Sequence, residues 1–234
     1  MENTLINIQL ALFFKDPTKV EPSLYISELA GVVGDHKQPL VISVPDKPEL
    51  NEVPVVQIRS QDEKVGINVS RARADLFIFG DGVLSFEELE PLFVEKTVNL
   101  FQIINAFKLP VKRIGFISKF FYKDKNSDQT ISKVIGADFK NIMKKGEDVP
   151  TDALVRYSQK ALISNLESNN LSSLEKATIQ IGEVEKQDGL ILMRDINTAQ
   201  DSDYSEVLSI EKLENYIREA ISIFDLDKFE KLLW

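Results

Sequence analysis

Three side chains of the types that ligate calcium in loop sites stand at alternate positions near the middle of the chain. Asp124, Asn126 and Asp128 occupy the first, third and fifth positions of a calcium-loop pattern. The pattern then fails, because Gln129 stands where the tight turn needs glycine and Ile135 where a bidentate glutamate is needed. The sequence therefore favours a polar turn over a metal loop.

A second acidic cluster consists of Asp201, Asp203 and Glu206, and its ligand spacing is equally incomplete. We interpret it as a solvated loop before a helix. The chain has no cysteine and one histidine, which excludes thiol nucleophiles, thiolate zinc sites, iron–sulfur clusters and multi-histidine metal sites. We expect no metal ion and no cofactor.

His36 lies in the loop-like sequence Gly-Asp-His-Lys-Gln-Pro, where it could act as a base beside Asp35. No G-x-S-x-G elbow or other serine signature accompanies it, so an exposed loop histidine is the favoured interpretation. Nucleotide motifs are also missing, since the Gly-Asp-Gly at 80–82 lacks the third glycine of a dinucleotide fingerprint. We predict no catalytic residue.

A candidate basic patch lies on a predicted strand and contains Lys112, Arg113, Lys119 and Lys123. Lysine and arginine on one face could contact phosphates. The alternative is a solvated strand face, which acidic proteins also display.

The overall charge argues against a protein that coats nucleic acid. The chain has 234 residues with 28 basic and 37 acidic side chains, a net charge of -9, and 43% apolar content. Phosphate binding needs a local excess of Lys and Arg. No apolar run approaches the roughly 18 residues of a membrane span, and Met1 is followed by Glu2 and Asn3 rather than by a basic and apolar leader. We expect a cytoplasmic protein without membrane contact.

The hydrophobic periodicity predicts an alternation of short strands and helices in the first half. A helix begins after Ser85, which forms a capping-box pattern with Glu88, and ends before Pro110. Asp188-Gly189 is typical of a hairpin turn. The predicted strands are 6–14, 40–44, 55–60, 65–70, 75–80, 111–124, 153–164, 174–185 and 189–197, and the other predicted helices are 22–29 and a segment after Ser209.

Each half thus has several antiparallel strands followed by a long amphipathic helix. We predict an α+β fold with antiparallel sheets, each covered by a long amphipathic helix, in two similar halves that suggest duplication. The predicted halves are residues 1–125 and 151–234. Residues 126–150 form a polar, lysine-rich linker with a short helix at 132–145.

The order of several motifs resembles an uncharacterised, sporadically distributed family of bacterial proteins of about this length. The similarity lies in IRSQD at 58–62, RIGFISKF at 113–120, LILMRDIN at 190–197, and IREAISIF at 217–224 before a terminal Leu-Trp. The family strand reads more like RIGLRYIN, so residues 116–119 depart from it. The resemblance assigns no catalytic role to any residue.

From these features we expect a non-enzymatic cytoplasmic component that recognises a protein partner through an acidic surface, in the manner of an antitoxin, an immunity protein or a chaperone. Two alternatives stay open. One is a carboxylate-based metal-dependent hydrolase, and the other is a nucleic-acid-associated defence component that uses the basic strand face around Arg113.

Overall fold

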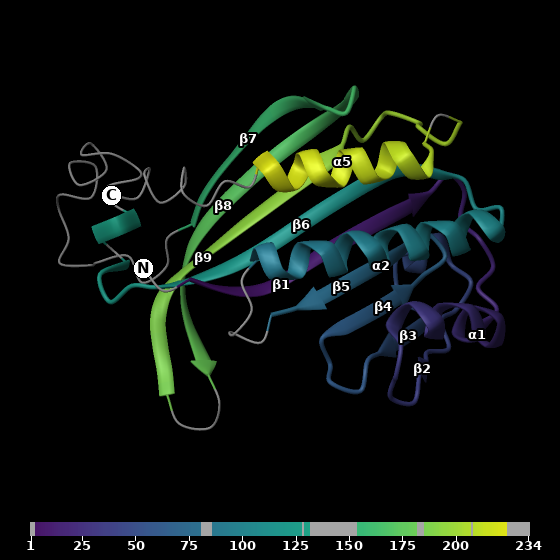
Figure 1. Cartoon of the computed structure of the whole chain (residues 1–234), viewed down its shortest axis with the longest axis horizontal. Helices are drawn as coiled ribbons and strands as arrows, with labels where there is room; N and C mark the ends of the chain where they lie inside the picture. Colours follow the sequence, from purple (N-terminus) through teal and green to yellow (C-terminus); the bar gives the residue numbers. More distant parts are fainter. Residues whose placement is uncertain are drawn as a thin grey trace.

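One antiparallel sheet organises the chain. The computed structural model describes residues 3–80, 86–127, 129–131, 154–181, 185–206 and 208–223. Within these residues, nine strands form a single sheet in the order β2-β3-β4-β5-β1-β6-β9-β8-β7 (Figure 1). The strands are β1 Asn3–Phe14, β2 Leu40–Val41, β3 Val56–Arg59, β4 Val65–Val69, β5 Arg73–Phe79, β6 Val111–Lys123, β7 Leu154–Ile163, β8 Leu166–Ile181 and β9 Glu185–Thr198. The helices are α1 Pro22–Val33, the short 3-10 helix η1 Pro48–Leu50, α2 Phe86–Ala106 and α5 Ile210–Ile223.

The prediction of separate sheets, each under its own long helix, in two similar halves is wrong. β6 pairs with β1 on one side and with β9 on the other, so Gly115 lies between Ala11 and Asn197 in one continuous sheet. Hydrophobic periodicity indicates which face of a strand is apolar, but it does not indicate which other strands pair with its two edges. A strand with two free edges can join sets of strands that are distant in sequence, and β6 does so.

The helices form a second layer on one face of the sheet. α2 and α5 lie side by side across it (Figure 1), and Arg218 of α5 reaches Glu90 of α2 at 3.8 Å. α1 packs against β3, β4 and α2. Of these helices only α2 is long, at 21 residues. Separate layers of helices and antiparallel strands make this an α+β arrangement.

The core lies between this helical layer and the sheet. One side of α2 is apolar and buried, and the ring centroid of its Phe93 lies 5.6 Å from that of Phe116 on β6. The α5 helix begins after Ser209, as predicted, because the Ser209 hydroxyl accepts a hydrogen bond from the Lys212 amide at 3.1 Å. The buried α2 and α5 side chains are Leu89, Phe93, Val94, Thr97, Leu100, Phe101, Ile104, Leu213, Tyr216, Ile217, Ala220 and Ile221.

The predicted hairpin turn at Asp188-Gly189 is wrong. Both residues lie inside β9, where Asp188 pairs with Thr178 and accepts its hydroxyl hydrogen bond at 2.7 Å. A Cβ atom at Gly189 would lie 2.1 Å from the Tyr122 carbonyl oxygen and 2.6 Å from Cζ of Phe121. The glycine is therefore required by close approach to β6 and not by a turn.

The predicted division into 1–125, 126–150 and 151–234 stays a prediction. Residues 127 and 129–131 are helical, and the predicted short helix at 132–145 lies outside the described residues. No helix in the described part of the chain is long and apolar enough to cross a membrane.

Phe101 of α2 is only 1% exposed, so Phe101→Ala should lower the free energy of unfolding by about 3 to 5 kcal/mol. Gln102→Ala is the matched control, because Gln102 is exposed on the same helix. Urea denaturation followed by circular dichroism measures both. A loss below about 1 kcal/mol for Phe101→Ala would contradict the burial of this helix face.

Candidate functional site

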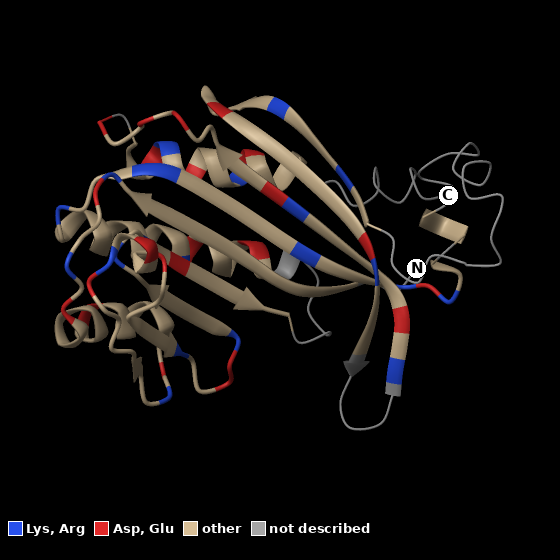
Figure 2. Cartoon of the chain, turned by 180° about the vertical axis from the view of Figure 1, so that it is seen from behind, with Lys and Arg blue, Asp and Glu red and all other residues tan. Residues whose placement is uncertain are grey.

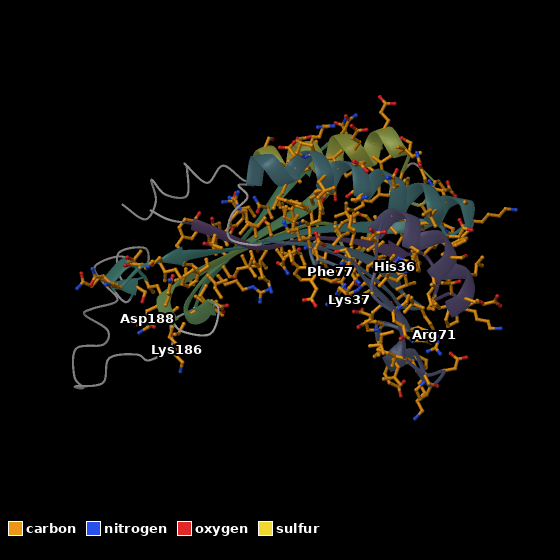
Figure 3. The ribbon with its side chains drawn as sticks, turned by 60° about the horizontal axis from the view of Figure 1, so that its bottom comes forward. His36, Lys37, Arg71, Phe77, Lys186 and Asp188 are labelled. Atoms are coloured by element: carbon orange, nitrogen blue, oxygen red, sulfur yellow. The ribbon has the colours of Figure 1, made fainter. Side chains whose placement is uncertain are left out.

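The face of the sheet opposite α2 and α5 is the candidate site, and we call it the open face. Figure 2 looks onto it, and no described helix crosses in front of β6, β9 and β8. Figure 3 shows Phe77 on this side of the sheet, away from the two helices. A strand side chain points to one face or the other at alternate positions, so the pairing register gives the residues that share the open face.

Strand pairing aligns the open-face side chains in rows that run across the sheet. One row begins on β3 and contains an arginine and an aromatic residue. The next row is rich in amides and small residues. The first row is Arg59, Gly66, Phe77, Gln9, Ile117 and Asp195, and the second is Gln57, Asn68, Asp75, Ala11, Gly115 and Asn197. Flanking rows hold Arg73, Phe13 and Arg113 on one side and Phe79, Asn7, Lys119 and Met193 on the other.

Arginines stack on phenylalanines at two places in these rows. The guanidinium carbon of Arg59 lies 5.4 Å from the ring centroid of Phe77 and 5.3 Å from that of Phe79. Phe13 is approached by two cations, Arg113 at 4.4 Å and Arg73 at 5.4 Å. Such cation–π contacts contribute about 0.5 to 2 kcal/mol each, depending on desolvation. We call these residues, Arg59, Arg73, Arg113, Phe13, Phe77 and Phe79, the arginine–phenylalanine cluster.

Two arginines of the cluster have unused hydrogen-bond capacity. Arg59 Nη1 and Arg113 Nε are buried and have no hydrogen-bond partner among the described residues. Neither side chain forms an ion pair with a described residue, and burial lowers the pKa of Arg59. A buried donor without an acceptor is costly. Both arginine side chains are half-buried as a whole, so an acceptor from outside the chain reaches Arg59 Nη1 or Arg113 Nε only if the side chain shifts.

Gly66 allows Arg59 to lie across β4. A Cβ atom at this position would stand 1.9 Å from Arg59 Nη1 and 2.7 Å from Arg59 Cζ. Because Arg59, Gly66 and Phe77 are paired in one row, the missing side chain leaves the path along which the guanidinium reaches the rings of β5. The glycine here serves close packing of a neighbouring side chain.

Asp75 fixes the position of Arg73 in the cluster. Its carboxylate accepts hydrogen bonds from Arg73 Nε and Gln9 Nε2, each at 3.0 Å. The residue is only 4% exposed, and burial raises the pKa of its carboxyl group even though Arg73 opposes the shift. Glu52 also reaches Arg73, at 3.3 Å.

The predicted basic patch is split by the fold. Arg113, Lys119 and Lys123 share the open face of β6, whereas Lys112 lies at a register shift and its carbonyl accepts the Tyr204 amide hydrogen bond at 3.1 Å. Arg113 belongs to the arginine–phenylalanine cluster. Phosphate binding by these four residues stays a prediction.

Sequence reasoning missed the rest of the cluster. One signal was available, because Phe13 and Phe77 stand on the otherwise polar side of strands whose other side is apolar. An aromatic residue on the polar side of an amphipathic strand is a candidate contact residue. Its arginine partners depend on strand register, which the pattern did not supply.

His36 is exposed, and the one side-chain hydrogen bond that the described residues give it is to a backbone carbonyl. Its Nδ1 atom lies 3.0 Å from the Gly34 carbonyl oxygen, and its backbone pairs with Ser60. The Ser60 hydroxyl instead donates to Asp62 at 2.6 Å and accepts from the Val65 amide. Lys37, next to His36, forms an ion pair with Glu63.

The acidic cluster near Asp124 is engaged in local structure. The Asp124 carboxylate accepts hydrogen bonds from the Asn126 amide at 2.7 Å and from the Thr130 hydroxyl at 2.6 Å, which is the pattern of a capped turn. Asp128 lies outside the described residues.

In the second acidic cluster, Asp203 connects its loop to the end of β1. Asp203 pairs with Lys15 at 2.9 Å, and hydrogen bonds from Ser205, then Lys15, hold the pKa of its carboxyl group well below its usual range. In the part of the chain that the structure describes, no group of three or more His, Asp or Glu residues is arranged to hold a metal ion.

Comparison with models of known protein families gave no match, and comparison with curated protein sequences gave none either.

The raised pKa of Asp75 predicts a pH-dependent stability. The folded state favours the protonated form of the Asp75 carboxyl. The contribution of this group to the free energy of unfolding is therefore fully present below the ordinary pKa of 3.8, and it is lost as the pH rises through the folded-state pKa. Relative to Asp75→Asn, which does not titrate, the wild type should therefore lose stability as the pH rises.

Urea denaturation of both proteins from about pH 3 to about pH 8 measures this difference. If the stability of the wild type relative to Asp75→Asn instead increases with pH, then Arg73 and Gln9 lower the pKa of Asp75 by more than burial raises it.

Proposed function

We propose that the protein is a non-enzymatic binding component that holds a protein partner on its open face, with partner carboxylates on the arginine–phenylalanine cluster. One observation carries the proposal. Among the residues that the structure describes, the buried donors Arg59 Nη1 and Arg113 Nε lack acceptors, while the guanidinium groups are stacked on phenylalanine rings. Stacking pre-orders the guanidinium group, so less conformational entropy is lost when a carboxylate binds.

The composition of the open face supports a protein partner. The chain has 21 lysines and only seven arginines, yet three of the seven arginines belong to the cluster. Arginine, aromatic residues and methionine are enriched in protein–protein interfaces, whereas lysine is depleted. Ile117, Met193 and Ile191 continue the apolar component of this face across β6 and β9.

Charge favours a protein partner over nucleic acid. The chain carries a net charge of -9, and the open face itself includes Asp195 and Glu175. A polyphosphate would meet these carboxylates along its length. A folded partner can place a few carboxylates against Arg59 and Arg113, within the roughly 8 Å over which charges act at physiological salt.

The sequence-based expectation of a contact through an acidic surface stays a prediction. Acidic residues are spread over strands, helices and loops (Figure 2), and the open face instead offers cations to an acidic partner. Antitoxin-like, immunity-like and chaperone-like roles all consist of holding a protein in this way. They remain proposals for this chain, as does its cytoplasmic location.

Affinity purification from nuclease-treated extract of the source cells, with immobilised protein, tests the proposal. The wild type should retain one protein at close to equimolar amount. The double variant Arg59→Ser/Arg113→Ser should retain about tenfold less or none, because it removes the two unsatisfied guanidinium groups. Circular dichroism verifies that the variant remains folded.

Arg218→Ser is the matched control. It removes the same type of charge from α5, where Arg218 pairs with Glu214 at 2.8 Å on the other side of the sheet, so retention should be unchanged. Equal retention by the cluster variant would contradict the proposal. Recovery of nucleic acid from untreated extract, lost in the cluster variant, would favour the nucleic-acid alternative instead.

A further inference from the structure

Among the described residues, the strand β7 forms one edge of the sheet and pairs on one side only. It is the last strand in the sheet order and pairs with β8 over all ten of its residues. In the described part of the chain no strand pairs with its other side. An unpaired strand edge presents a row of N–H and C=O groups that can pair with another chain.

The turn before β8 shows which backbone groups face outward. Ser164 and Asn165 have φ values of 47° and 61° between the paired residues Ile163 and Leu166. Positive φ at both central residues is the signature of a type I′ hairpin, whose flanking residues form a hydrogen-bonded pair. Hydrogen-bonded and non-hydrogen-bonded pairs then alternate along the ladder. The even-numbered residues 154 to 162 therefore direct their N–H and C=O groups to the free edge.

The side chains of β7 are unusually exposed for their types. Leu154 is 61% exposed, Leu162 is 63% exposed and Tyr157 is 41% exposed. The pairing register places Leu154, Arg156, Ser158, Lys160 and Leu162 on the side that continues the open face. The two leucines therefore leave apolar side-chain surface near both ends of the edge strand.

All charged side chains of β7 are positive. β7 contains Arg156 and Lys160 and no acidic residue, and neither cation forms an ion pair with a described residue. Since opposite charges stabilise directly paired strands and like charges destabilise them, an incoming strand should carry acidic residues opposite Arg156 and Lys160.

We infer that β7 binds an extended acidic segment of a protein partner as a tenth strand of the sheet. Backbone hydrogen bonds to the even-numbered residues supply the affinity, and the alternate side chains supply the specificity. The segment has apolar residues opposite Leu154 and Leu162 and carboxylates opposite Arg156 and Lys160. This site is separate from the arginine–phenylalanine cluster and recognises a different feature, namely an extended backbone.

A second copy of the chain fits this edge poorly. If two β7 strands paired about a two-fold axis at Ser158, each Arg156 would stand opposite the Lys160 of the other copy. An axis at Gln159 places the same cations diagonally across from each other. Four like charges on one side of the joined strands oppose this pairing.

The inference is tested with a synthetic peptide of sequence Leu-Thr-Glu-Thr-Ser-Thr-Glu-Thr-Leu. It should bind the full chain, and the version with lysine in place of both glutamates should bind about tenfold more weakly or not at all. In nuclear magnetic resonance spectra, the amides of Arg156, Ser158 and Lys160 should gain protection from hydrogen exchange, and that of Gln159 should not change.

Two variants locate the binding to the edge. Ser158→Pro removes an outward N–H group without a ladder hydrogen bond, so the fold should be kept and peptide binding lost. The double charge reversal Arg156→Glu/Lys160→Glu should exchange the preference, so that the lysine peptide binds better. It also provides a test if the proline variant does not fold.

Arg218→Ser, on the other side of the sheet, is the matched control and should bind the acidic peptide as the wild type does. Loss of peptide binding in Arg59→Ser/Arg113→Ser would mean that the peptide occupies the arginine–phenylalanine cluster, and it would overturn this inference and not the proposed function. Equal binding of both peptides, no binding of either, or no change after charge reversal would overturn the inference. So would a dimer in light scattering that Ser158→Pro converts to a monomer, because the occupant would then be a second copy.

Discussion

The pairing of β6 on both of its edges is the constraint on which the rest of the structure depends. β6 holds β1 along one edge and β9 along the other, and the Thr198 hydroxyl reinforces the second junction by accepting the Ile114 amide hydrogen bond at 3.0 Å. Its helix-facing residues Phe116 and Phe120 are buried. The same strand therefore anchors the core and supplies Arg113 to the open face.

Because the helices occupy one face, the other face acquires its character from the outward side chains of the strands. Arg59 and Arg113 stack on phenylalanine rings. Asp75 orders Arg73 by a buried hydrogen bond instead of leaving it free in solvent. The cluster is thus ordered by contacts within the chain itself, which would lower the entropy cost of the binding that we propose.

Local patterns in the sequence predict the separate elements well, and distant pairings poorly. The alternation in β1 and the Ser209 cap of α5 were predicted because their causes lie within a few neighbouring residues. The single sheet was not predicted, since nothing near Gly115 indicates that Asn197 is its neighbour. Asp188-Gly189 was misinterpreted because a glycine required by close approach to Tyr122 looks the same in sequence as one required by a turn. The candidate site is likewise only partly predictable. Alternation along β5 indicates that Phe77 lies on the face away from the core, but the contact with Arg59 depends on the strand register, which the local sequence does not specify.

The position of β6 also has a consequence for how the chain acquires its structure. The partners Ala11 and Gly115 are roughly a hundred residues apart in sequence, and Asn197 follows almost as far beyond. Closing such long loops is entropically costly before it is rewarded, and folds built on distant pairings form slowly. During synthesis, β6 emerges long before β9 exists, so one of its edges stays unpaired until most of the chain has left the ribosome. The order of translation therefore exposes, for a time, a strand that the finished sheet pairs on both edges.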